Sequence, residues 1–212
     1  MAEAVLWDYW RSSSAYRVRI ALALAGVDAE RRQIDLTSGA QADPAHLARN
    51  PQLLVPVLDI DGVRLTQSLA IIEYLSETRG AGFLPDTPAD RARVRALAHA
   101  IAMEIQPICN LRVARQVKEL TGGATGMTDW IGHHITTGFT ALEALLDHPA
   151  TGRHCHGDTV TLADICLVPQ VYNARRWGVD LTQFPRITAI AAALATVPAI
   201  AAAHPDCAEP DG

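Results

Sequence analysis

The sequence is short of basic residues and of long apolar runs, and each shortage excludes a class of protein. Eighteen Lys and Arg stand against 23 Asp and Glu, which gives a formal net charge of −5. General nucleic-acid binding needs a basic face, so no nucleic-acid partner is expected. No apolar stretch approaches membrane-spanning length, and Pro198 interrupts the alanine-rich segment 189–203. We therefore expect no membrane segment.

Paired cysteines are also missing. The four cysteines are widely spaced and none belongs to a C-x-x-C pair, which indicates reduced thiols in a cytoplasmic protein. Residues 1–4 lack the basic and apolar regions of a signal peptide, in agreement with that location. The run His154-Cys155-His156 offers ligating atoms, but no second ligand pair lies at a fitting distance, so no metal site is predicted. The cysteines are Cys109, Cys155, Cys166 and Cys207.

Otherwise the chain has a composition that is ordinary for a globular enzyme, and the pattern of its apolar residues differs between the two halves. Its 212 residues, 49% of them hydrophobic, can bury the core of one large domain or two small ones. In the first half the pattern predicts a β-α-β-α-β-β-α order, which combines a parallel crossover with a terminal hairpin in a small α/β domain with a mixed four-stranded sheet. Strands are expected at residues 4–9, 31–36, 55–59 and 63–65, and helices at 13–25, 44–48 and 68–79.

The second half is predicted to be all helical. Glycines and prolines between residues 80 and 88 indicate a linker at 81–87, which separates a first domain at 1–80 from a second at 88–212. Pro107 should kink the first long helix of the second domain, and Pro169 lies inside the third. Apolar residues at helical spacing predict helices at 89–117, 128–146, 161–175, 187–194 and 199–203.

Three consecutive hydroxyls lie where the first strand turns into the first helix. Ser12, Ser13 and Ser14 follow the expected strand at residues 4–9. Backbone N–H groups are unpaired at a helix N-terminus and the helix dipole is positive there, so the position favours an anion. Capping the helix is the simplest role for one serine. A cap needs one hydroxyl only, so the remaining serines and the flanking Arg11, Arg17 and Arg19 indicate more than a cap.

Two further pairs of residues admit both a structural and a functional interpretation. A trans proline in a loop is the common case for Val55-Pro56, whereas a cis bond would turn the Val55 backbone outward to pair with an extended peptide. Gln67-Ser68 directly precedes an apolar helix, where Ser68 is expected as the N-cap. Alternatively, the Ser68 hydroxyl and the free N–H groups of that helix bind a ligand carboxylate, and Gln67 adds a hydrogen bond.

Taken together, these segments resemble the zeta class of glutathione transferases, a family that includes maleylacetoacetate and maleylpyruvate isomerases. The similarity extends over nearly the whole chain, in order and at fitting intervals. The resemblance implies a glutathione transferase architecture: a thioredoxin-like α/β N-terminal domain and an all-α C-terminal helical domain. It also implies glutathione as cofactor and a homodimer. The similarity is carried by segments 12–19, 50–58, 67–75, 105–111, 157–164 and 167–171.

The family pattern implies which residues contact the reactive part of glutathione. Ser12, Ser13 and Ser14 match positions beside the sulfur, with Ser12 as the first choice for the hydroxyl that donates to the thiolate. The family often has cysteine where Ser14 stands, so any role of that thiol is lost here. Gln106 and Asn110 match residues that reach the tripeptide from the helical half.

The pattern also implies how the backbone of glutathione is held. Val55 would bind the cysteinyl backbone through a cis Pro56, and Gln67 and Ser68 would bind the γ-glutamyl carboxylate. The segment Thr161-Leu162-Ala163-Asp164 matches a helix-capping box of the family, whose role is in folding.

The family reaction is the cis–trans isomerisation of a maleyl diacid in aromatic-compound breakdown. A thiolate adds to the conjugated double bond, the bond rotates as a single bond and the thiolate leaves, so glutathione is regenerated. The small dicarboxylate substrate needs cations: Arg176 matches a substrate-binding arginine, and Arg11 and Arg112 are candidates for a second carboxylate clamp. Two alternatives stay open. One is a glutathione-dependent dehalogenase or transferase of small α-halo acids, and the other is a non-catalytic glutathione-binding module.

Overall fold

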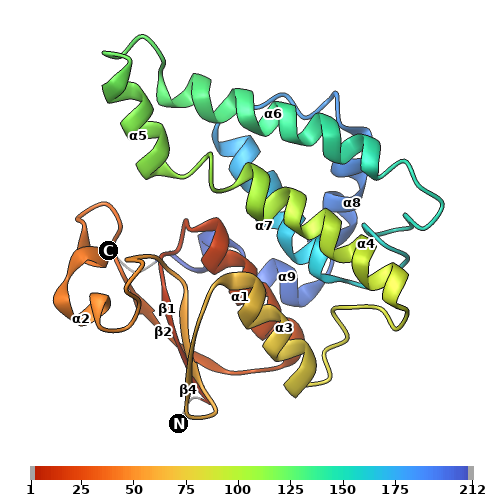
Figure 1. Cartoon of the computed structure of the whole chain (residues 1–212). Helices are drawn as coiled ribbons and strands as arrows, with labels where there is room; N and C mark the ends of the chain where they lie inside the picture. Colours follow the sequence, from red (N-terminus) through yellow and green to blue (C-terminus); the bar gives the residue numbers. More distant parts are fainter. Residues whose placement is uncertain (1–2, 210–212) are drawn as a thin grey trace. The chain divides into compact units, whose positions relative to one another are not determined.

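The computed structural model of the chain describes residues 3–209, and its N-terminal part is built around a four-stranded sheet (Figure 1). The strands lie in the order β2-β1-β3-β4; β1 runs parallel to β2 and antiparallel to β3, and β3 and β4 form the hairpin. The predicted mixed sheet, crossover and hairpin are therefore confirmed. The elements are β1 (Ala4–Asp8), α1 (Ser13–Ala25), β2 (Ala29–Gln33), η1 (Ala40–Ala42), α2 (Pro44–Leu47), β3 (Val57–Ile60), β4 (Val63–Thr66) and α3 (Ser68–Thr78).

The second strand lies two to three residues earlier than the sequence predicts. The prediction at 31–36 followed the apolar residues Ile34 and Leu36, but the hydrogen-bonded register with β1 ends at Gln33. The strand is an exposed edge, and after Ala29 it consists of charged and polar residues, so it has no apolar pattern to reveal its position. Ile34 is buried just beyond the strand end.

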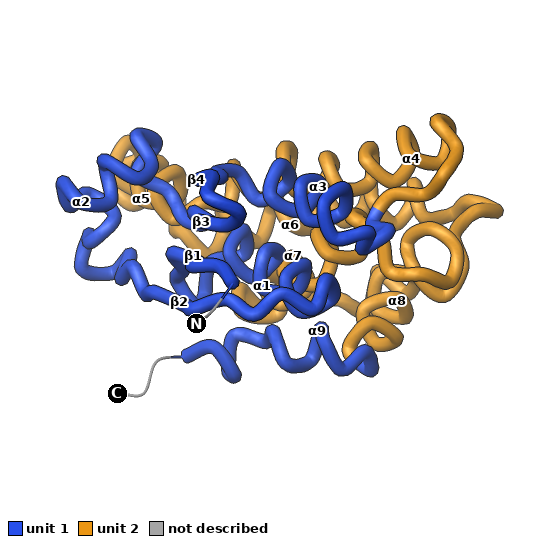
Figure 2. Tube along the Cα trace, turned by 90° about the horizontal axis from the view of Figure 1, so that it is seen from below, with its two compact units in different colours: residues 1–83, 196–212 blue, residues 84–195 orange. Residues whose placement is uncertain are grey.

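A C-terminal segment belongs to the same compact unit as the sheet (blue in Figure 2). The unit comprises residues up to Phe83 and those from Thr196 onward, including α9 (Pro198–Ala202) and η3 (Pro205–Cys207). Helix α1 packs against both α3 and α9. The sequence assigned this segment to a helical domain at 88–212, so the structure differs from the prediction here; the outer ends of the predicted domains, 1–2 and 210–212, lie outside the described residues.

Two arginines that pair with a buried aspartate attach the C-terminal segment to the sheet. Asp8, at the end of β1, is fully buried between Arg19 of α1 at 2.9 Å and Arg31 of β2 at 3.0 Å. The same two arginines donate to backbone carbonyls of the segment, Arg19 to Ala203 at 3.2 Å and Arg31 to Ala208 at 2.7 Å. Burial lowers the pKa of Arg19, and the Asp8 carboxylate opposes that effect. The ion triad thus joins β1, α1 and β2 to the C-terminal segment.

The second unit, residues 84–195, is all helical, as predicted (orange in Figure 2). The expected single helix at 89–117 is divided, however: an α-helix ends at His99, a π-helical turn follows, and a new helix starts at Leu111. Pro107 lacks the N–H that a continuous helix needs, so it breaks the helix rather than bending it. The helices are α4 (Pro88–His99), the π-helix η2 (Ala100–Ile105), α5 (Leu111–Leu120), α6 (Met127–Leu145), α7 (Leu162–Arg176) and α8 (Pro185–Ala195).

The predicted capping box closes the N-terminus of α7. Both oxygens of the buried Asp164 carboxylate are used: Oδ2 accepts from the backbone N–H and hydroxyl of Thr161, and Oδ1 accepts from the N–H of Cys155 at 2.8 Å. The box therefore also fixes the loop that precedes the helix.

Within residues 3–209 all four cysteines are free, and three of them are buried. In the same range, no group of three or more Cys, His, Asp or Glu side chains is arranged to hold a metal ion. None of the helices described combines the length and apolar character needed to cross a membrane.

Candidate functional site

The serine loop joins β1 to α1 in the first unit. Ser12 is the N-cap of α1, and its Oγ accepts from the N–H of Ala15 at 3.3 Å. Two hydrogen bonds fix the backbone of this loop. Arg19 donates to the carbonyl of Trp10 at 2.9 Å, and the N–H of Ser12 donates to the carbonyl of Tyr9 at 2.8 Å. The capping interpretation of Ser12 is therefore correct, yet it uses only the oxygen.

A hydroxyl that accepts a helix N–H keeps its own proton for another acceptor. Ser12, Ser13 and Ser14 are all half-buried at the positive end of a 13-residue helix, so an anion there meets both the hydroxyl proton and the helix dipole. The capping bond of Ser12 is therefore compatible with its second predicted role, donation of the hydroxyl proton to a thiolate.

The N-terminus of α3 is the second part of the site. Gln67, not Ser68, occupies the N-cap position, and its side chain makes no capping hydrogen bond. Ser68 begins the helix and is buried, and Arg17 of α1 donates to its Oγ at 3.4 Å. The sequence placed Ser68 one position too early, since a serine before an apolar helix is the usual N-cap. With no side-chain cap, the first-turn N–H groups of α3 can donate hydrogen bonds to an anion.

Gln67 is itself constrained. Its φ of 68° lies in the left-handed region, which costs a non-glycine residue of the order of 1–3 kcal/mol. Its amide donates to Gln52 Oε1 at 2.8 Å. The sequence did not predict Gln52 as the hydrogen-bond partner of Gln67. The only indication was that Gln52 lies inside the segment 50–58. Arg17 was missed as a Ser68 contact for another reason: a fully buried arginine on α1 has no sequence signal of burial.

The peptide bond between Val55 and Pro56 is cis, as the resemblance implied. It directly precedes β3, whose centre pairs with β1. The serine loop, the cis proline and the α3 N-terminus therefore all belong to the first unit, where the sheet and α1 position them.

The remaining predicted residues of the glutathione site lie in the second unit. Asn110 is the N-cap of α5, and its Oδ1 accepts from the N–H of Arg112 at 3.1 Å. Gln106 is half-buried and directly follows the π-helix η2. A π-helical turn is uncommon and is frequent at functional sites, so its position beside Gln106 agrees with a binding role.

The three candidate arginines of the substrate site are exposed. In the first unit, the Arg11 guanidinium stacks on the ring of Trp10 at 3.9 Å. In the second unit, Arg112 lies in the first turn of α5, and Arg176 ends α7 with its guanidinium 5.5 Å from the centroid of the Trp177 ring. The Arg11 and Arg176 guanidinium groups each contact the tryptophan next to them in the chain.

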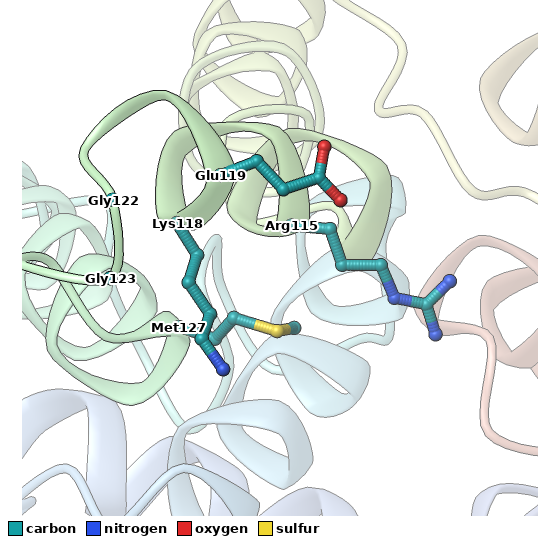
Figure 3. Close-up of a pocket in the computed structure, with 6 residues that line it drawn as sticks. All are labelled: Arg115, Lys118, Glu119, Gly122, Gly123 and Met127. Atoms are coloured by element: carbon teal, nitrogen blue, oxygen red, sulfur yellow. The ribbon is translucent and has the colours of Figure 1, made fainter.

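A hollow of about 480 Å³ is lined by residues of α5, the turn after it and the start of α6; Figure 3 shows these residues. The Lys118 and Met127 side chains lie beside one another in it, whereas Arg115 extends away from them. A second hollow of about 480 Å³ lies by the β3–β4 hairpin of the first unit. Neither hollow is lined by a residue predicted for the glutathione or substrate site.

The fold has known counterparts. Two family models match the chain: the glutathione S-transferase N-terminal domain at residues 2–77 and the glutathione S-transferase C-terminal domain at residues 128–207. The chain is 58% identical over 210 residues to the maleylacetoacetate isomerase of Rhizobium meliloti, covering 98% of this chain and 99% of that protein.

Solved structures show the same similarity. A holo structure of a maleylpyruvate isomerase, described as a bacterial zeta-class glutathione S-transferase, has a TM-score of 0.93 at 44% identity, covering 98% and 99% of the two chains. A maleylacetoacetate isomerase from Anaeromyxobacter dehalogenans, with bound dicarboxyethyl glutathione and citrate, has a TM-score of 0.86 at 43% identity, covering 100% and 99%. The chain therefore belongs to the glutathione S-transferase family and, within it, to the zeta-class maleylacetoacetate and maleylpyruvate isomerases.

Proposed function

We propose that this chain is a glutathione-dependent isomerase that converts maleylacetoacetate or maleylpyruvate to its fumaryl isomer. The high identity to isomerases over the full length of the chain supports this function. The observation that carries it is the α3 N-terminus, where an uncapped helix start, the Ser68 hydroxyl and the buried Arg17 guanidinium meet. This arrangement suits a carboxylate such as that of the γ-glutamyl group.

The residues present fit glutathione along its length. Ser68 and Gln67 hold the γ-glutamyl carboxylate, and the Val55 backbone before Pro56 holds the cysteinyl group. Gln106 and Asn110 contribute from the second unit. Bound glutathione supplies the thiolate that adds reversibly to the conjugated double bond.

The serine loop keeps that sulfur anionic near neutral pH. A free thiol titrates at about 8.5. A hydrogen bond to a charged group contributes about 1.5–3 kcal/mol and a helix N-terminus about 0.3–1 kcal/mol. At about 1.4 kcal/mol per unit, the two lower the thiol pKa by about one to three units. Ser12 needs no separate base, because its donated proton stabilises charge rather than being transferred.

Arginines hold the two carboxylates of the diacid. We assign one carboxylate to Arg176 and the other to Arg11 and Arg112, since the guanidinium fork matches a carboxylate in two places. Two related structures contain such acids, one with malonate and glutathione and one with dicarboxyethyl glutathione and citrate. Arg176→Ala is then expected to raise KM for the diacid more than it lowers kcat.

The activity is tested with both maleyl substrates in parallel. We expect turnover of at least one, dependent on added glutathione and restored by fresh substrate without further glutathione. Turnover of neither, with glutathione shown to bind, contradicts the proposed reaction. Comparison of kcat/KM with a small α-halo acid separates the isomerase from the dehalogenase alternative.

We also propose that the chain is a cytoplasmic homodimer. The reduced, mostly buried cysteines suit a reducing compartment. Large apolar side chains stay exposed on the single chain, among them Met103 at 58% and Leu120 at 79%. Light scattering coupled to size-exclusion chromatography tests the dimer, and twice the mass of 22.8 kDa is expected.

A further inference from the structure

The loop before the cis proline is held by two side chains that the proposed mechanism does not use. His46 Nε2 lies 3.1 Å from the carbonyl oxygen of Leu54, and Asn50 Nδ2 donates to the same oxygen at 2.9 Å. A carbonyl oxygen only accepts, so Nε2 of His46 carries the proton. His46 is 1% exposed and Asn50 is 3% exposed, so water does not compete for these bonds. Two buried donors thus converge on one carbonyl.

This carbonyl shares a peptide group with the N–H of Val55. The group is planar, with its C=O and N–H pointing in opposite directions. Because His46 and Asn50 hold the Leu54 oxygen on their side, the Val55 N–H points away from them. Donors on the carbonyl also polarise the peptide group and strengthen its N–H as a donor.

The rest of the loop supports this orientation. Asn50 Oδ1 accepts from the N–H of Gln52 at 3.0 Å, and the carbonyl of Asn50 accepts from the N–H of Leu53 at 2.9 Å. Leu53 has a φ of 57°, a conformation that disfavours a leucine unless its surroundings enforce it. The loop is therefore held against its local preference by bonds that start at α2.

We propose that His46 is a positioning residue for glutathione: its hydrogen bond to the Leu54 carbonyl fixes the Val55 N–H in the direction that binds the cysteinyl carbonyl. The inference rests on the proposed function, because it takes Val55 as the cysteinyl contact. His46 acts through the peptide group and does not touch the ligand.

The test is calorimetric binding of glutathione and of S-methylglutathione to the full chain and to His46→Phe. Phenylalanine keeps a ring of similar volume but has no donor. We expect Kd to rise about three- to tenfold, the effect of one hydrogen bond, and by the same factor for both ligands because the sulfur is not involved. With saturating glutathione, kcat should change less than about twofold.

A second pair of variants separates positioning from packing. His46→Gln and His46→Met have side chains of similar length, and only glutamine retains an N–H donor. Glutamine is expected to restore most of the affinity and methionine to behave like phenylalanine. His133→Phe, at an exposed position of α6, is the control and should bind like the parent.

The outcomes distinguish the two proposals. If the parent chain takes up no glutathione, the proposed function and this inference both fail. If the parent binds but His46→Phe and His46→Met bind equally well, the inference about His46 alone is overturned. Equal weakening by glutamine and methionine overturns it too, since the donor would then be irrelevant.

Discussion

At the residue scale, the proposed mechanism gives the Ser12 hydroxyl two tasks. Its oxygen accepts from Ala15 and caps α1, while its proton is available to a thiolate. Ser12→Ala removes both, so it should lower kcat by about ten- to a hundredfold, the loss of a bond to a charged group. Glutathione affinity at low pH, where the thiol is neutral, should change little. The pKa of bound glutathione, followed by thiolate ultraviolet absorbance against pH, should rise.

Ser12→Thr is the matched control, because threonine keeps the hydroxyl and also caps helices. It is expected to retain the low thiol pKa. If Ser12→Ala leaves that pKa unchanged, another hydroxyl of the loop is the donor. The lost cap should also reduce stability by about 1 kcal/mol, so both assays belong well below the unfolding transition.

The cysteines provide a second prediction at this scale. Burial raises the pKa of Cys109 to about 12 and that of Cys155 well above its usual value, while Cys207 is exposed. The thiolate is the reactive form, so only Cys207 should react quickly with a chromogenic disulfide in the native protein. All four should react after denaturation. Mass spectrometry of the native adduct identifies the site, and rapid labelling of Cys109 would contradict its burial.

The site residues show what a sequence reveals at this scale. The roles of residues inside motifs were predictable, since serines at a helix start and a proline before a strand have few possible structural or chemical roles. Their partners were not. Arg17 is as hydrophilic in sequence as any surface arginine, and only the packing of α1 places it beside Ser68.

At the element scale, the π-helix η2 has a specific neighbour on α6. Gly138 lies within α6, where glycine is about 1 kcal/mol worse than alanine, so a packing reason is expected. A Cβ at this position would come 2.5 Å from Cδ1 of the buried Ile105 at the end of η2. Glycine therefore lets the two helices approach closely.

Gly138→Ala should lower the free energy of unfolding by up to about 2 kcal/mol, because overpacking outweighs the gain in helix propensity. Gly132→Ala is the matched control: it lies on the same helix with no atom within 4 Å of the added Cβ, and should stabilise by about 0.5–1 kcal/mol. Urea midpoints measure both. Adding Ile105→Val should recover part of the Gly138→Ala loss, and a stabilised Gly138→Ala variant would show that Ile105 moves freely.

The helices of the second unit show how far the periodicity of apolar residues predicts helix bounds. Long amphipathic helices such as α6 and α7 were predicted to within one residue at each end. The interruption between α4 and α5 was predicted only as a kink, because apolar residues continue at helical spacing through it. Hydrogen bonds, not side-chain pattern, distinguish a π-helical turn from an α-helical one.

At the scale of the whole molecule, the last part of the chain packs with the first. Nothing in an alanine-rich segment indicates which unit it joins. The two arginines that pair with Asp8, Arg19 and Arg31, lie 184 and 177 residues before the carbonyls that they bind in this segment. In the sequence, Asp8 and Arg19 look like ordinary surface charges until the fold buries them, whereas Arg31 stays partly exposed. The predicted boundary failed here because long-range polar contacts carry no local pattern.

Because of this packing, we expect the C-terminal segment to contribute to the stability of the first unit. Deleting residues 197–212 should lower the free energy of unfolding of that unit by at least about 3 kcal/mol, since two hydrogen bonds to charged groups and the burial of Ile200 are lost. The arginines would also stay beside Asp8 without their carbonyl partners. Deleting 210–212 alone leaves these contacts intact and is the control. Hydrogen exchange of α1 and β2 measures the effect locally, and unchanged protection there would mean that the segment is only attached to the unit and does not support it.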